Sequence, residues 1–161
     1  MVQATLIFKF IIFLSCFTFS FSPQAQSISG KAKIIDGDTL HINKNKIRLH
    51  GIDAPEKNQK CIFKNKKWPC GKKSTIELKK LINNQNVKCK IKDIDIYKRY
   101  VAICTVNKIN LNQIMVKKGW AIAYRYYSKD FIKEEEIAKQ NKIGIWRGSF
   151  EEPYIYRKKN K

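Results

Sequence analysis

The sequence predicts a mainly β fold with α-helices (β+α), in which five short strands are combined with about three helices. Three observations support this fold class. From Gly30 onward, short segments alternate apolar and polar residues and are separated by turn signals. Later segments carry apolar residues at helical spacing. A length of 161 residues with 43% hydrophobic content suits one compact domain with its own core.

Residues 1–25 have the pattern of a secretory signal peptide, with an early Lys9, an apolar run and small polar residues near Ala25. An uncleaved membrane anchor is the alternative, but Lys9 leaves a run shorter than the roughly 20 residues that a span needs. Lipidation at Cys16 is disfavoured because the apolar run continues past it. We therefore expect a secreted or periplasmic bacterial protein without stable membrane association after cleavage.

The mature chain is predicted to begin with a meander of three strands. KAKIID at 31–36 is followed by a DG turn and TLHINK at 39–44, and KIRLHGI at 46–52 follows the turn NKN. The last two segments alternate apolar and polar residues, as half-buried antiparallel strands do. Pro55 ends the third strand because proline cannot donate to a sheet ladder, and a Lys-rich loop follows to Gly71.

Helices are predicted at 72–83, 111–119 and 129–141, the second ending at Gly119 as a C-cap. The third helix is expected to expose an acidic triplet, Glu134, Glu135 and Glu136. The order of elements suggests a five-stranded Greek-key barrel of the OB (oligonucleotide/oligosaccharide-binding) type spanning residues 26–150. We expect Trp146 to pack on this body and the basic tail at 151–161 to be frayed.

Four cysteines remain in the mature chain, an even number that suits an oxidising compartment. The strands of a predicted hairpin at 87–106 place Cys89 opposite Cys104, where Cα atoms lie about 4.5–5.5 Å apart, a distance that a disulfide can bridge. Cys61 then pairs with Cys70. A zinc site is the alternative, but the spacing contains no C-x-x-C pair, and the two histidines, His41 and His50, fit as strand residues.

The chain carries 33 Lys and Arg against 13 Asp and Glu, a net charge of +20 that becomes +19 once Lys9 leaves with the signal peptide. Such a charge implies a polyanionic partner, either nucleic acid, anionic lipid or acidic polysaccharide. A compositional bias of the genome would also enrich lysine, so charge alone does not choose among them. A monomer is expected because one core suffices and self-repulsion discourages association.

Acidic residues are concentrated in one short stretch of this basic chain. Asp38 opens a predicted strand, while Asp53 and Glu56 follow the end of another, so antiparallel pairing can bring the three carboxylates together. Asp36, in a DGD turn, reads as a turn residue. Three carboxylates tolerate one another when a cation lies among them, and hard oxygen ligands favour Ca²⁺ or Mg²⁺. Outside the cytoplasm, Ca²⁺ is the expected ion.

Two arginines complete this arrangement. Arg48 lies on the strand leading to Asp53, and Arg99 lies in the distant hairpin. A guanidinium group fits phosphate bidentately, and a metal with two such groups can neutralise the charge that builds up during phosphodiester cleavage. A carboxylate beside them can orient or deprotonate water, and we assign that role to Glu56. Each residue alone would more often be structural, so the hypothesis depends on their conjunction.

The motifs that contain these residues resemble, in order and spacing, those of the staphylococcal-nuclease-like thermonuclease family. The resemblance runs from about Lys31 to Trp146 and rests on IDGDT, IRLHGIDAPE, DIYKRYVAIC and NQIMVKKGWAIAYRYY. It implies an OB barrel with helices and a Ca²⁺-dependent endonuclease that cuts DNA and RNA to 3′-phosphorylated products. The loop that carries Cys61 and Cys70 resembles the secreted, disulfide-containing bacterial branch of that family.

The resemblance also implies roles for individual residues. Asp38 and Asp53 match the metal-binding carboxylates, and the main-chain carbonyl of Ala54 matches a further metal ligand. Glu56 matches the catalytic glutamate. The phosphate-binding arginines match Arg48 and Arg99, and the tyrosines that line the nucleotide pocket match Tyr97 and Tyr124.

Two positions depart from the family pattern. The chain has Ile96 where the family often has a basic residue, and Lys98 where it often has a glycine before the second arginine. These departures bear on substrate affinity and on turn geometry. Two other functions remain open: a noncatalytic OB-fold nucleic-acid-binding module, and a cationic surface-binding or toxin protein. Intact carboxylates argue against the binding module, because binding a polyanion gains nothing from acids in the groove.

Overall fold

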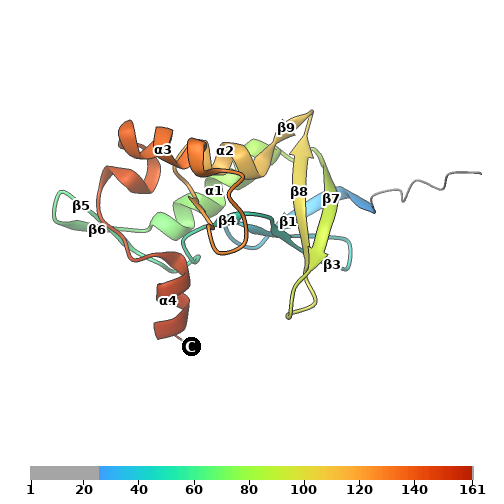
Figure 1. Ribbon diagram of the computed structural model, residues 1–161, viewed down its shortest axis with the longest axis horizontal. Helices are drawn as coiled ribbons and strands as arrows, with labels where there is room; N and C mark the ends of the chain where they lie inside the picture. Colours follow the sequence, from blue (N-terminus) through green and yellow to red (C-terminus); the bar gives the residue numbers. More distant parts are fainter. Residues whose placement is uncertain (1–25, 161) are drawn as a thin grey trace, which may run out of the picture.

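The computed structural model of the protein describes residues 26–160, so the predicted signal peptide lies outside the described residues. Five strands form the barrel, and their sheet order is β3-β2-β1-β7-β8, closed by parallel pairing of β3 with β8 (Figure 1). All other neighbours in the barrel are antiparallel. This confirms the predicted five-stranded barrel. The strands are β1 (Ser27–Ile34), β2 (Thr39–Ile42), β3 (Asn45–Leu49), β7 (Asn86–Ile94) and β8 (Tyr100–Val106).

Alternation of side chains along the strands builds the core. Leu40 and Ile42 on β2, and Ile47 and Leu49 on β3, are almost completely buried, because every second residue of a strand faces the same side. A short strand β9 (Ile109–Asn110) extends the sheet beside β8. The core therefore lies inside the barrel and continues under the helices.

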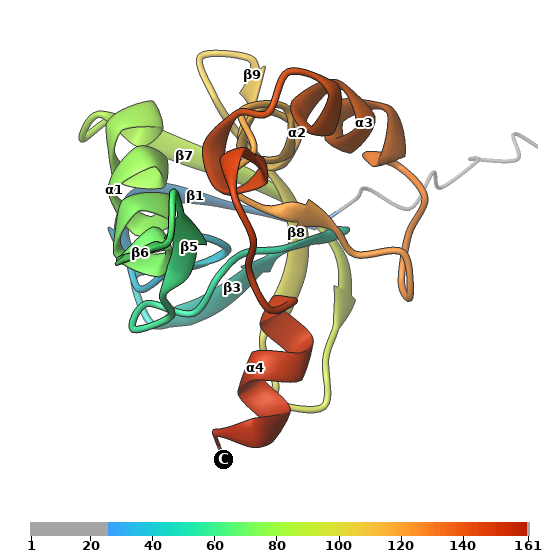
Figure 2. The same cartoon turned by 90° about the vertical axis from the view of Figure 1, so that its left-hand side faces the viewer.

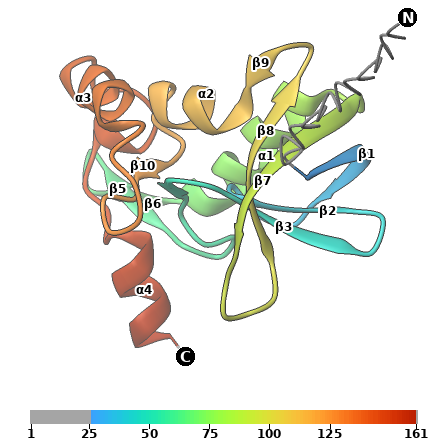
Figure 3. The ribbon, with the colours of Figure 1, turned by 45° about the vertical axis from the view of Figure 1, so that its right-hand side comes forward.

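Three helices lie side by side on the barrel: α1 (Cys70–Ile82), α2 (Leu111–Lys117) and α3 (Ile132–Gln140) (Figure 3). The first ends at Asn83, which adopts the left-handed conformation and donates its N–H to the carbonyl of Lys79. A short 3-10 helix, η1 (Gly144–Arg147), follows α3. The predicted helices are thus confirmed to within a few residues at each end.

The acidic triplet of α3 is only partly a surface feature. Glu135 is buried and accepts the N–H of Ala123 at 3.1 Å, while Arg125 and Lys139 pair with its other carboxylate oxygen. The expectation that all three glutamates are exposed was therefore wrong at Glu135. A buried carboxylate requires such partners. Ala123 and Arg125 come from the segment before α3, and Lys139 comes from the next turn of α3 itself.

Both predicted disulfides are present, Cys61 with Cys70 and Cys89 with Cys104. The second joins residues directly opposite each other on β7 and β8. The first closes the Lys-rich segment, which forms a hairpin of β5 (Cys61–Phe63) and β6 (Lys66–Trp68) instead of the expected loop. Disulfides of this kind suit an oxidising compartment.

The sequence suggested a frayed C-terminal tail, and this expectation was wrong. The tail forms a fourth helix, α4 (Pro153–Lys159). Its proline occupies the first helical turn, where no N–H is needed. Figure 2 shows α4 standing apart from the other helices, and Figure 1 shows it projecting to the same side of the barrel as the tip of the β7–β8 hairpin. Within residues 26–160, no helix has the length and apolar character required to cross a membrane.

Candidate active site

The first part of the site is the turn between β1 and β2. The N–H of Asp38 donates to Asp36 Oδ1 at 3.0 Å, which confirms Asp36 as a turn residue. Gly37 lies between them because a Cβ there would lie 2.7 Å from the Cβ of Ala54 and closer still to Ser74. The turn therefore packs tightly against the segment that follows the third strand.

The second part is β4 (Ile52–Asp53), which pairs with β10 (Ile122–Ala123) so that Asp53 lies opposite Ile122. Asp53 is completely buried and Asp38 is 2% exposed. The N–H of Ala54 donates to Asp38 Oδ2 at 2.8 Å and so ties the two acidic segments together. The structure thus brings the predicted pair of aspartates into one site.

Arg48 joins these two carboxylates. It lies on β3 opposite Thr39, and its guanidinium group donates from Nη1 to Asp38 Oδ1 and from Nη2 to Asp53 Oδ1, each at 2.7 Å. Burial by itself would lower the pKa of Arg48, but the charges of Asp38 and Asp53 outweigh it and raise the pKa. Arg48 therefore stays charged and fixes the distance between the two aspartates.

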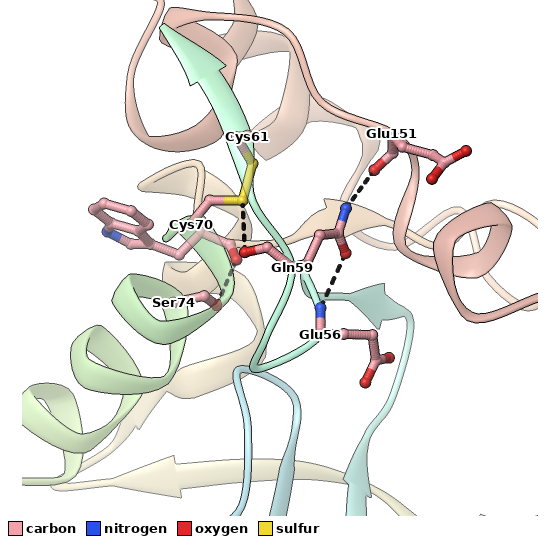
Figure 4. Close-up of a disulfide and its surroundings, with 7 residues drawn as sticks. Glu56, Gln59, Cys61, Cys70, Ser74 and Glu151 are labelled. Atoms are coloured by element: carbon pink, nitrogen blue, oxygen red, sulfur yellow. Dashed lines mark hydrogen bonds between the residues drawn. A yellow bond between two sulfur atoms is a disulfide. The ribbon is translucent and has the colours of Figure 1, made fainter. Parts of the chain in front are cut away.

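The backbone of Glu56 is held by the buried side chain of Gln59. Its N–H donates to Gln59 Oε1 at 3.1 Å, and Gln59 Nε2 donates to the carbonyl of Glu151 at 2.7 Å (Figure 4). The carbonyl of Gln59 in turn faces the Sγ atom of Cys70 at 3.5 Å. Figure 4 shows the carboxylate of Glu56 turned away from the disulfide. This network connects the loop that carries Glu56 with the disulfide hairpin and the C-terminal segment.

A second arginine reaches the site from α4, and sequence reasoning missed it. Arg157 donates from Nη1 to Asp53 Oδ1 at 2.8 Å and to Glu56 Oε1 at 2.9 Å, and from Nη2 to Asp53 Oδ2 at 3.1 Å. Burial would lower its pKa, but these bonds and the charge of Asp53 raise it. No sequence motif indicated this arginine, which is one of many cations in the basic tail.

Negative charge exceeds positive charge in the acidic cluster, which we define as Asp36, Asp38, Asp53 and Glu56. Burial raises the pKa of Asp36 to about 7, and the charge of Asp38 adds to this effect. Burial and then Asp38 likewise raise the pKa of Asp53. Asp38, Asp53 and Glu56 pair with the two guanidinium groups, while Asp36 pairs with neither, so part of the mutual repulsion of the four acids remains.

This donor set suits a divalent cation. Hard carboxylate oxygens with an excess of negative charge are the ligands that Ca²⁺ and Mg²⁺ prefer. Among residues 26–160, however, no three acidic, His or Cys side chains already form a metal cage. Two guanidinium groups contact these oxygens instead. The chemistry of the site therefore fits the ion, and its binding would require the arginines to rearrange.

Arg99 does not contact the acidic cluster in this structure. Its Nε and Nη2 atoms each lie 2.7 Å from Asp95 Oδ2, and its guanidinium group lies 5.3 Å from the ring centroid of Tyr97. Lys98 adopts the left-handed conformation with φ 58°, the region that favours the glycine of the family pattern. Ile96 at the hairpin tip is 90% exposed. The contacts of Arg99 thus stay within the β7–β8 turn.

A pocket of about 840 Å³ opens beside Asp53. Tyr124 lines this pocket, whereas Tyr97 lies outside it and is 60% exposed on the hairpin. Burial and the nearby charge of Asp53 raise the pKa of Tyr124. Further rings surround it, with centroids 5.1–6.5 Å from that of Tyr124: Tyr126, Tyr127 and Tyr154.

A five-stranded barrel with arginines and an aromatic pocket on its surface is typical of OB folds that bind nucleic acids. The profile of the family described as staphylococcal nuclease homologue matches residues 46–148. An uncharacterized endonuclease of Haemophilus influenzae is 39% identical over 137 residues, which cover 80% of this chain and 72% of that protein.

Two further relatives match most of their own length. Micrococcal nuclease of Shigella flexneri is 30% identical over 147 residues, which cover 80% of this chain and 79% of that protein. An uncharacterized endonuclease of Escherichia coli O157:H7 is 31% identical over 153 residues, which cover 89% of this chain and 94% of that protein. The chain therefore belongs to the staphylococcal nuclease family, and with it to the nucleases, a class of hydrolases.

Proposed function

We propose that the protein is a Ca²⁺-dependent, sugar-nonspecific endonuclease that hydrolyses phosphodiester bonds of DNA and RNA and leaves 3′-phosphorylated products. The observation that carries the proposal is the pairing of Arg48 with both Asp38 and Asp53, next to the half-buried carboxylate of Glu56. This arrangement supports a site that combines one phosphate-binding arginine, cation ligands and a candidate base.

Asp38, Asp53 and the main-chain carbonyl of Ala54 are the proposed cation ligands. When bound, the cation supplies positive charge to the phosphate and makes its phosphorus more electrophilic. Arg48 is already held between the two aspartates, so a small rotation would turn one of its N–H groups from a carboxylate to a phosphate oxygen. It would then stabilise negative charge that develops on the equatorial oxygens.

Glu56 is the proposed residue that orients and deprotonates water. Glu56 would take a proton from the water as the water oxygen forms a bond to phosphorus. The bond from phosphorus to the 5′ oxygen breaks, and the leaving oxygen takes up a proton from the solvent. This cleavage leaves the phosphate on the 3′ side. Gln59 holds the backbone of Glu56 and so supports the position of its carboxylate.

Arg99, Tyr97 and Tyr124 are the proposed substrate-binding residues outside the acidic cluster. Tyr124 lies in the pocket beside Asp53, where a base can stack on its ring. Arg99 would exchange Asp95 for a substrate phosphate. Stacking on a base does not read the sugar, which supports activity on both DNA and RNA.

The proposed setting is secreted or periplasmic, with the protein acting as a monomer. Two disulfides support an oxidising compartment. A net charge of +19 after removal of residues 1–25 supports both attraction of a polyanion and mutual repulsion of copies.

The test uses purified protein without residues 1–25, incubated with single-stranded DNA or with RNA in Ca²⁺ or in EDTA. We expect degradation of both substrates in Ca²⁺ only, with 3′ ends that a polymerase extends only after phosphatase treatment. Glu56→Gln should reduce the rate at least about 100-fold, because general-base assistance contributes that much. Degradation that persists equally in EDTA and in this variant would contradict the proposal, and salt-sensitive binding without degradation would favour a binding module.

A further inference from the structure

We propose that α4 is a self-inhibitory segment, because Arg157 contacts both carboxylate oxygens of Asp53, one of the proposed cation ligands. Docking of α4 and binding of the cation then exclude each other. This inference rests on the proposed function, since it concerns the proposed cation site. It concerns a helix outside the family match, which ends at residue 148.

The contacts of Arg157 are those of a group that neutralises the site. Both oxygens of Asp53 accept hydrogen bonds from it, and its Nη1 atom also donates to Glu56. Asp53 Oδ1 additionally accepts from Arg48. A cation on either oxygen of Asp53 would lie within a few ångströms of two guanidinium groups, at a buried position where like charges repel strongly. Arg157 must therefore withdraw before the cation binds through Asp53.

The remaining attachment of α4 is weak. Pro153 is the buried residue among its seven, and helices this short are not stable alone in water. Tyr154 is half exposed, with its ring centroid 6.5 Å from that of Tyr124. Lys159 pairs with Glu151 in the segment just before the helix. Arg157 supplies the ion pairs that join α4 to Asp53 and Glu56 of the site, and its release removes them.

The chain before α4 is anchored independently. Ser149 pairs with Ile62 through two backbone hydrogen bonds of 2.8 and 2.9 Å, and the carbonyl of Glu151 accepts from Gln59. The helix can therefore leave without disturbing these bonds. Figure 2 shows α4 joined to the body at its N-terminal end, with its other end projecting outward. The segment that contains Ser149 and Glu151 is thus anchored to the body, and α4 can move without it.

The first experiment measures Ca²⁺ affinity by calorimetry without nucleic acid. Three variants are compared with the parent: Arg157→Gln, Arg157→Lys, and Lys158→Gln as a matched control that removes one charge from an exposed neighbouring position. We expect Arg157→Gln to bind Ca²⁺ at least about tenfold more tightly, because the competing state is removed. Arg157→Lys should lie between parent and Arg157→Gln, and Lys158→Gln should stay within about twofold of the parent.

Equal affinity of Arg157→Gln and Lys158→Gln would overturn the inference and leave the proposed function intact. A rise in KM for DNA without any change in Ca²⁺ affinity would also overturn it, because it would make Arg157 a phosphate ligand. If neither the parent nor any variant binds Ca²⁺, then the proposed cation dependence fails as well. The Glu56→Gln assay tests hydrolysis separately, so the two failures remain distinguishable.

The second experiment follows amide hydrogen exchange of α4 in the parent protein. The N–H of Tyr156 donates to the carbonyl of Glu152 at 2.9 Å and reports on the helix. We expect it to exchange faster as Ca²⁺ is added, while the N–H of Ser149 keeps its protection. Unchanged or slower exchange of Tyr156 at saturating Ca²⁺ would contradict displacement of the helix.

Discussion

Arg48 and Asp53 form the central ion pair of the acidic cluster, with 2.7 Å between Nη2 and Oδ1. The same guanidinium group reaches Asp38 at 2.7 Å, so one arginine spans the ends of two short strands. Its planar fork makes this possible, since two nitrogens point in fixed directions. Asp53, which is completely buried, would otherwise lack this counter-charge.

The Arg48→Lys variant should therefore lose most of its activity. A lysine keeps the charge but cannot donate to both aspartates in fixed directions or bind phosphate bidentately. We expect kcat to fall by about 100-fold or more, the scale seen when one preorganised donor is removed. Steady-state kinetics on single-stranded DNA would measure this. Lys46→Gln on the exposed side of the same strand is the control, and a comparable loss there would show that Arg48 acts only through surface charge.

Replacing Gln59 should affect both stability and activity. Gln59→Leu would leave the N–H of Glu56 and the carbonyl of Glu151 without their side-chain partner. Both groups are only partly buried, so the loss lies toward the lower end of the range of about 1–3 kcal/mol that an unpaired buried group costs, and the free energy of unfolding should fall by about 2 kcal/mol in total. Urea titration measures this change, and kcat should decline in conditions where the variant remains folded. Gln140→Leu, at an exposed position of α3, should leave both quantities almost unchanged.

The two disulfides should differ in their effect on catalysis. Each closes a short loop, with sequence separations of 9 and 15, and double serine replacement of either should lower the free energy of unfolding by about 3 kcal/mol. Loss of Cys61–Cys70 should also reduce kcat several-fold, because Cys70 adjoins Gln59 and thus the support of Glu56. Loss of Cys89–Cys104 should leave kcat of the folded protein near that of the parent. Equal losses of kcat in the two double variants would contradict the predicted link between the Cys61–Cys70 disulfide and Glu56.

The turn of the β7–β8 hairpin should be sensitive to acid through Asp95. Its Oδ1 atom accepts the N–H groups of Tyr97 and Arg99, and its Oδ2 atom accepts from the Arg99 guanidinium group. Burial alone would raise the pKa of Asp95, but these partners outweigh it and lower the pKa. A lowered pKa stabilises the folded state at pH values above the unfolded pKa of about 3.9, and this contribution is lost as pH falls through the folded value.

Asp95→Asn should therefore lower the free energy of unfolding by about 1 kcal/mol at pH 7, the scale of one hydrogen bond to a charged group. The difference from the parent should shrink as pH falls below about 4. Unfolding curves at several pH values would measure it. The control is Asp93→Asn, because Asp93 is exposed and accepts only the N–H of the adjacent Ile94 among the contacts of the described residues. A difference that grows on acidification would contradict the assigned sign.

Much of the fold and part of the site could be predicted because the determining contacts are local. Alternation along β2 and β3 defines which residues enter the barrel, and the hairpin register places Cys89 opposite Cys104. Asp38 and Arg48 meet because they flank one short hairpin, ten residues apart. A period of two and a tight turn are readable in any sequence, so these contacts needed no knowledge of the rest of the chain.

Long-range partners could not be predicted in the same way. The bond between Arg157 and Asp53 spans 104 residues, and the bond between Gln59 and the carbonyl of Glu151 spans 92. The expectation that Glu135 is exposed was wrong for a different reason: its partners Ala123 and Arg125 lie only 12 and 10 residues away, but in a segment without a periodic pattern. Periodicity shows which face of an element is apolar, but it does not show which distant segment covers that face.

Spacing along one strand or across one turn was enough to predict the strands, the pairing of Cys89 with Cys104 and the contact of Arg48 with Asp38. The pairings that close the barrel join segments far apart in the chain, as β1 with β7 and β3 with β8. The tertiary structure decided which cation reaches the acidic cluster. Arg157 contacts Asp53 and Glu56, while Arg99 stays with Asp95 in its own hairpin. The physical reason is that a buried carboxylate takes its partner from whichever cation the path of the folded chain brings within hydrogen-bond distance.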